Sequence, residues 1–127
     1  MTDRELLELA AKAFGFGKKN LPEKPHCWTE SEYPKGSGKH GALWNYVGYG
    51  DTAELWNPLS DDGDALRLVV KLELIVGHDA EDKLAYAQVR HPYYSANEFY
   101  GGSGINPYAA TRRAVVRAAA EVGRRMP

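Results

Sequence analysis

The sequence predicts a single α+β domain over residues 1–127, with an antiparallel sheet of about four strands and helices on both faces of that sheet. Residues 2–5, Thr-Asp-Arg-Glu, match a capping box at the start of a helix. Residues 84–90 alternate between larger and smaller side chains, as a strand does. Asn106-Pro107 predicts a second helix start, because Asn caps free amides and Pro suits the first helical position.

The N-terminal third predicts a helix, a loop and a strand. The first helix is expected to end at Gly15 and Gly17, after apolar residues at helical spacing. Residues 18–41 contain three prolines and a glycine-serine tract and are predicted to be a loop-rich insertion, of which the part with Cys27, Trp28 and Tyr33 is expected to lie on the core or to add an edge strand. Residues 42–49 are short and aromatic-rich, which indicates a strand.

The middle of the chain predicts a turn followed by an acidic helix start. Trp56 and Pro58 are interpreted as a turn anchored in the core, and Ser60 is the predicted N-cap. The helix is expected to run to about Leu72, with Leu66 and Val70 widening its apolar stripe into a largely buried helix. Alternation over 72–76 indicates that a strand follows almost directly, and Gly-His-Asp at 77–79 with the acidic residues after it predicts a turn.

The C-terminal third predicts a strand, a loop and a helix. Residues 84–90 place alanines on one face, where a helix can pack closely. Residues 92–104 are predicted to be a long aromatic loop that ends in Gly-Gly-Ser-Gly, and long loops in compact domains are often functional. The last helix is expected to run from Pro107 to about Arg124, with a basic outer face that is usually only solvated.

Composition excludes several classes of protein. An apolar content of 43% and a charged content of 26% argue against wholesale disorder and against a membrane protein. A net charge of −1 lacks the basic excess of a protein that wraps duplex nucleic acid. Cys27 is the only cysteine, which excludes an intrachain disulfide and favours a reducing, cytoplasmic location. No signal peptide or membrane span is expected.

Three segments of the chain together resemble the phage ABA sandwich domain family. They are residues 2–13 (TDRELLELAAKA), 56–68 (WNPLSDDGDALRL) and 108–121 (YAATRRAVVRAAAE), and the central one is the most specific. The resemblance implies an α-β-α sandwich that is encoded by a bacteriophage or prophage and made in the bacterial cytoplasm. It implies no activity, cofactor or catalytic residue.

Two patterns with catalytic potential have stronger structural explanations. Asp61, Asp62 and Asp64 are ligands that suit a hard cation, but carboxylates in a first helical turn are explained by the helix dipole. Cys27 with a histidine (His26, His40, His78 or His91) would make a nucleophile and base, but no protease signature surrounds it. We therefore expect neither a metal site nor a catalytic site.

The strongest candidate binding region lies between the last predicted strand and the last helix. Backbone amides of a glycine-rich turn and a helix start bind phosphate, and two arginines follow within two turns. The aromatic side chains nearby suit stacking on a base or insertion into a partner. The alternatives are a plain flexible connection and aromatic cover for the sheet edge. The candidates are Tyr93, Tyr94, Tyr100, Gly102, Ser103, Asn106, Arg112 and Arg113.

These patterns leave three functional hypotheses, in order of preference. The first is a non-enzymatic phage accessory protein that binds a host or defence-system protein. The second is an anti-defence sponge that sequesters a phosphorylated signalling nucleotide with the region around Arg112 and Arg113. The third is a metal-dependent hydrolase that uses Asp61 and Asp62. No membrane or nucleic-acid partner is expected.

Overall fold

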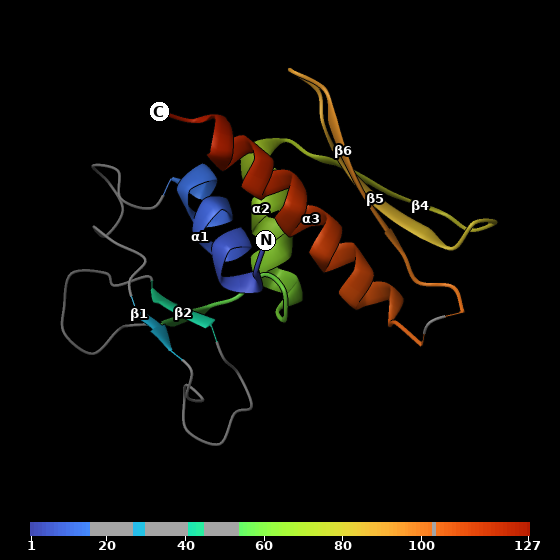
Figure 1. The fold of residues 1–127 in the computed structure, drawn as a ribbon, viewed down its shortest axis with the longest axis horizontal. Helices are drawn as coiled ribbons and strands as arrows, with labels where there is room; N and C mark the ends of the chain where they lie inside the picture. Colours follow the sequence, from blue (N-terminus) through green and yellow to red (C-terminus); the bar gives the residue numbers. More distant parts are fainter. Residues whose placement is uncertain (16–26, 30–40, 45–53, 103) are drawn as a thin grey trace.

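The computed structural model describes residues 1–15, 27–29, 41–44, 54–102 and 104–127. The fold is α+β, and its described part contains three helices and two three-stranded antiparallel sheets (Figure 1). The elements are α1 (Asp3–Phe14), β1 (Cys27–Thr29), β2 (Gly41–Trp44), β3 (Glu54–Trp56), α2 (Asp62–Leu72), β4 (Ile75–Asp79), β5 (Leu84–Val89), β6 (Tyr94–Phe99) and α3 (Pro107–Arg125).

Helix α1 begins and ends as its sequence predicts. The Thr2 hydroxyl accepts a hydrogen bond from the Glu5 amide at 3.1 Å, which satisfies one of the free amides of the first turn. Gly15 ends the helix with φ 103°, a left-handed conformation that glycine adopts without steric cost. The buried face of α1 carries Leu6, Leu7, Ala10, Ala11 and Ala13.

Helix α2 begins one residue later than predicted. Asp61 is the N-cap and accepts from the Asp64 amide at 2.8 Å, whereas the predicted cap, Ser60, lies in the preceding turn. The reason is the turn at Asn57, whose carbonyl accepts from the amides of both Ser60 and Asp61. The core-anchored turn is confirmed, because Trp56 is only 5% exposed and Pro58 is fully buried.

The predicted turn is confirmed for the acidic residues after Asp79 and wrong for residues 77–79, because these complete β4. The turn follows at residues 80–83, where the Asp79 carboxylate accepts from the amides of Glu81 and Asp82. Gly77 lies within the strand for a packing reason. A Cβ at this position would lie 2.3 Å from the Tyr86 hydroxyl, so the glycine makes room for the Tyr86 ring on the neighbouring strand.

Strand β5 confirms the predicted alternation, and β6 corrects the predicted loop. Ala85 and Ala87 are fully buried, so the face of small side chains does face the core. Residues 94–99 of the predicted loop instead form β6, which pairs with β5 and sets Ala96 opposite Ala87. Serine, alanine and asparagine have weak strand propensity, and here the tertiary contact of Ala96 overrides it.

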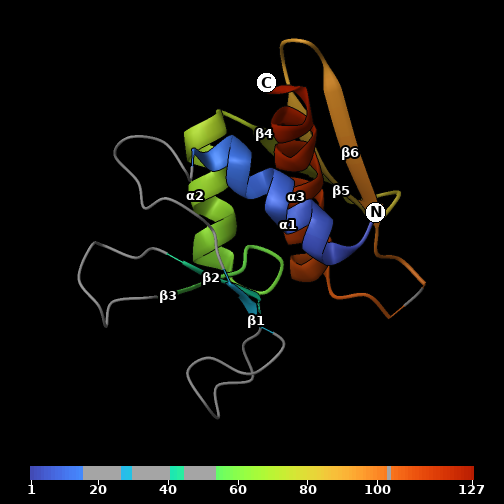
Figure 2. The same ribbon diagram turned by 60° about the vertical axis from the view of Figure 1, so that its left-hand side comes forward.

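The three helices pack against one another, and α3 connects them to the second sheet. Helix α3 packs against β5 and β6, α1 crosses α3, and α2 lies beside α3 (Figures 1 and 2). The contact uses small side chains, among them Ala114 and Ala118 of α3, which are fully buried. The closest approach is at Gly123, where a Cβ would lie 2.0 Å from the carbonyl oxygen of Leu9 in α1.

The described strands therefore form two sheets, β1-β2-β3 and β4-β5-β6, and not one sheet of about four strands. Helices on both faces of one sheet are not confirmed. Within the predicted strand at 42–49 the structure describes a strand to Trp44, and residues 45–49 lie outside the described part. Most of the predicted insertion at 18–41 also lies outside it. None of the described helices is long and apolar enough to cross a membrane.

Candidate functional site

The structure separates the aromatic residues of the predicted binding region. Tyr93 precedes β6 and Tyr100 follows it, so the strand holds them roughly 23 Å apart at about 3.3 Å per residue. Tyr93 is exposed and accepts a hydrogen bond from Gln88, whereas Tyr100 contacts the His78 ring at 5.9 Å between centroids. Tyr94 is half-buried against the core. These side chains do not form one aromatic surface.

The glycine-rich turn and the helix start are described except for Ser103, which lies outside the described residues. Gly102 is exposed with φ 80°. Asn106 caps α3 as predicted, and its side-chain oxygen accepts from the Tyr108 amide at 2.7 Å. The Asn106 side chain therefore already binds one of the helix-start amides that the phosphate hypothesis requires for a ligand.

The two candidate arginines point to different parts of the fold. Arg112 donates to the Leu59 carbonyl at 2.8 Å and to the Asp62 carboxylate at 2.7 Å. Arg113 pairs with Asp3 at 2.9 Å and lies 3.5 Å from the Glu98 carboxylate. Both guanidinium groups are thus engaged by carboxylates of distant segments, and they do not converge on the glycine-rich turn.

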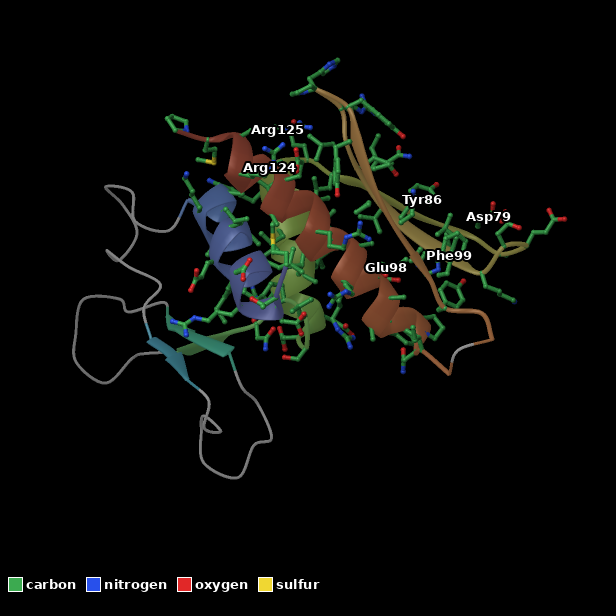
Figure 3. The ribbon with its side chains drawn as sticks, in the orientation of Figure 1. Asp79, Tyr86, Glu98, Phe99, Arg124 and Arg125 are labelled. Carbon is green, nitrogen blue, oxygen red and sulfur yellow. The ribbon has the colours of Figure 1, made fainter. Side chains whose placement is uncertain are left out.

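The remaining arginines of α3 are paired in the same way. Arg117 donates to Glu98 of β6 at 2.9 Å, and Glu98 lies between β6 and α3 (Figure 3). Arg124 and Arg125, at the C-terminal end of α3, both donate to Glu121. The hydrogen bond from Arg124 lowers the pKa of the Glu121 carboxyl below its usual value. The basic face of α3 is therefore a set of ion pairs within the protein.

The three aspartates of the acidic helix start also have structural roles. Asp61 caps α2, Asp62 pairs with Arg112, and Asp64 accepts from the Asn57 amide at 3.0 Å. Among the described residues, no group of three histidine, cysteine, aspartate or glutamate side chains could hold a metal ion. The Cys27 side chain, with His26 and His40, lies outside the described part of the molecule.

The described residues form an apolar groove between α2, β4 and the N-terminal half of α3. Its volume is about 590 Å³, within the range of roughly 300–1,000 Å³ that is typical of ligand pockets. Val76 of β4 and the core residue Val115 of α3 contribute to its lining. The apolar lining consists of Ala65, Leu66, Val69, Val76, Pro107 and Val115.

Two polar contacts lie along this groove and hold its walls together. The Arg112–Asp62 ion pair joins α3 to the start of α2. The Thr111 hydroxyl lies 2.7 Å from the Pro107 carbonyl oxygen, to which it donates, and forms a 2.9 Å hydrogen bond with Nε2 of His78 in β4. The groove is therefore braced at α2 and at β4 by side chains of α3.

Two large apolar side chains that line the groove are exposed to solvent. Leu66 on α2 is 62% exposed and Tyr108 on α3 is 69% exposed, and both line the groove. Val70, one turn beyond Leu66, is 70% exposed and is not part of the lining. The prediction that Leu66 and Val70 lie in a largely buried helix is wrong, because only Ala65 and Leu68 of α2 are buried.

The wide apolar stripe on α2 is the sequence feature that indicates the groove. A helix that packs on one neighbour needs only part of the circumference to be apolar, and α2 exceeds that. The other walls come from Val76 and from the start of α3, which lie far away in the sequence. No sequence pattern predicts that these three segments lie side by side.

Comparison with known proteins identifies no relative of this chain. No family model, no curated protein and no solved structure matches this chain.

Proposed function

We propose that the protein is a non-enzymatic binding protein, and that the apolar groove between α2, β4 and α3 receives part of a partner protein. The observation that carries this proposal is the pair of exposed apolar side chains, Leu66 and Tyr108, on opposite walls of a groove of about 590 Å³. Apolar surface beside a concavity is typical of interaction sites, since leaving it in water costs free energy.

The physical gain from filling the groove is substantial. Burying a leucine side chain fully contributes about 1.5–3 kcal/mol, and Leu66 retains most of its surface for such a contact. Tyr108 adds a large ring with a polar tip, the kind of side chain that often dominates interfaces. A partner that covers both residues therefore has two anchoring contacts before any polar contact forms.

We place this binding activity in a phage or prophage accessory protein of the bacterial cytoplasm, which acts on a host or defence-system protein. The support is the resemblance of three sequence segments to the phage ABA sandwich domain family, together with the α+β class of the structure. A sandwich with helices on both faces of one sheet is part of the same proposal.

We prefer a protein partner to the phosphorylated nucleotide because of where the cations lie. Arg112 and Arg113 already donate to Asp62 and Asp3, and a phosphate would have to displace these carboxylates. The lining of the groove is mostly aliphatic, which suits apolar side chains better than a charged nucleotide.

The proposal is tested by affinity capture from phage-infected bacteria with a matched pair of variants. Leu66→Asp places a charge in the groove, whereas Val70→Asp places the same charge at an equally exposed position outside it. Loss of a captured protein with Leu66→Asp and its retention with Val70→Asp is the expected result. Equal capture by both variants and the parent protein would count against the groove as the binding site.

A further inference from the structure

We infer that the partner binds as an extended peptide strand, which pairs with the free edge of β4 and directs alternate apolar side chains into the groove. This inference rests on the proposed binding function and specifies the partner's conformation and chemistry. It follows from three features of the described residues: the unequal edges of the second sheet, the position of the groove along β4, and the charges around it.

The two edges of the β4-β5-β6 sheet differ in protection. At the β6 edge, Arg117 of α3 donates to the Asn97 carbonyl at 3.0 Å, and Arg125 donates to the Pro92 carbonyl just before the strand. These contacts satisfy carbonyl groups that would otherwise attract another strand. At the β4 edge, no described strand pairs on the side away from β5.

The sequence of β4 also lacks the usual defences of an edge strand. Ile75–Asp79 reads Ile-Val-Gly-His-Asp and contains no proline or lysine, the residues that commonly block strand addition. Its residues are of intermediate exposure except the exposed His78, so solvent reaches most of the strand. Strand β4 can therefore accept one further antiparallel or parallel neighbour.

The groove lies where the side chains of such a neighbour would point. Val76 and His78 are two residues apart, lie on one face of β4, and both line the groove. A strand added beside β4 directs every second side chain to that same face, toward Leu66 and Val69 of α2. Main-chain hydrogen bonds would supply affinity, and the groove would select apolar side chains at alternate positions.

Charge indicates what flanks the apolar part of the peptide. The turn after β4 carries exposed Glu81 and Asp82 beside a single exposed lysine, Lys83, so it is net acidic, and Asp62 at the groove is 73% exposed although it pairs with Arg112. A lysine or arginine of the partner near the end of β4 is complementary to these carboxylates. The occupant is therefore an extended segment with alternating apolar residues and a basic residue at one end.

Charge also argues against a second copy of this chain as the occupant. Antiparallel pairing of two β4 strands about Gly77 would set Ile75 of each copy opposite Asp79 of the other. That pairing sets an apolar side chain against a carboxylate at each end of the strand, and a foreign peptide avoids this mismatch.

The test begins with a displayed library of short random peptides, from which binders of the whole protein are selected. The tightest binder is then synthesised with a fluorescent label. Anisotropy then measures its affinity for the parent protein, for Leu66→Asp and for Val70→Asp. We expect Leu66→Asp to weaken binding by about tenfold or more, as loss of one buried leucine contact predicts. Val70→Asp should leave the affinity unchanged.

Backbone N-methylation of that peptide, one residue at a time, distinguishes a strand from other bound forms. If the peptide binds as a strand, N-methylation lowers its affinity at every second residue, because only alternate amides of the peptide face β4. Losses that follow a helical spacing, or a library without any binder, would overturn the inference. So would concentration-dependent dimerisation of the protein that is abolished by Leu66→Asp, since a second copy would then fill the groove.

Failure of this inference is separable from failure of the proposed function. If capture from infected cells depends on Leu66 but the N-methylation pattern has no period of two, the groove still binds a partner and strand addition is refuted. If capture does not depend on Leu66, the binding site itself is refuted.

Discussion

Substitution of Gly123 tests the packing of α1 on α3, which holds the helices together. Gly123 is buried near the end of α3, and a Cβ there would lie 2.0 Å from the carbonyl oxygen of Leu9 and 2.8 Å from its carbonyl carbon. Both atoms are backbone, so no side-chain rotation relieves the overlap. Gly123→Ala therefore requires α1 and α3 to move apart.

Two opposing effects determine the stability of Gly123→Ala. Alanine is favoured over glycine within a helix by about 1 kcal/mol. Overpacking of a tight interior typically costs about 1–3 kcal/mol, and here the overlap exceeds 1 Å against rigid backbone, which places the cost at the upper end. We expect a net loss of about 1–2 kcal/mol in the free energy of unfolding.

Urea unfolding followed by circular dichroism measures this loss, with Gly63→Ala as the control. Gly63 lies in the first turn of α2, and a Cβ there meets only the side chains of Asp61 and Arg67, at 3.2 Å and 3.3 Å. That variant should be unchanged or slightly more stable than the parent. If Gly123→Ala is as stable as Gly63→Ala, the close approach of α1 and α3 is refuted.

Three further variants test the turn, the ion pairs and the groove. Trp56→Ala removes a nearly buried ring and should lower the free energy of unfolding by about 3–5 kcal/mol in urea titration; a loss below 1 kcal/mol would contradict its core position. Glu121→Gln should be less stable than the parent at neutral pH, since Arg124 lowers the pKa of Glu121 and this stabilisation is present above the ordinary value of 4.5. Thermal melts should show the difference vanishing as the pH falls through the lowered pKa. Thr111→Val removes the hydroxyl that binds His78 and should cost about 0.5–1.5 kcal/mol by urea unfolding, with no change expected if that hydrogen bond is absent.

The elements that local chemistry specifies were predictable from the sequence. Thr2, Gly15 and Asn106 act on amides or carbonyls within a few residues, so their patterns predict the ends of α1 and the start of α3. The alternation in β5 is also local. The sequence favours Ser60 as the cap of α2, whereas the turn at Asn57, which makes Asp61 the cap, depends on backbone hydrogen bonds that composition does not reveal.

The features that depend on distant contacts were not predictable in the same way. Strand β6 contains Ser95 and Asn97, and only its pairing with β5 makes it a strand. Arg112 pairs with a carboxylate fifty positions away and Arg113 with one at the other end of the chain, so the sequence shows a basic helix and the structure shows internal ion pairs. The groove itself exists only where α2, β4 and α3 meet.

The most direct test of the groove as a binding site is site-specific photocrosslinking in phage-infected bacteria. A benzophenone amino acid replaces Leu66 in one variant and Val70 in another, two exposed positions on α2 of which only Leu66 lines the groove. The account predicts a discrete crosslinked partner from position 66 and none from position 70. The same adduct from both positions, or adducts from position 70 alone, would contradict it.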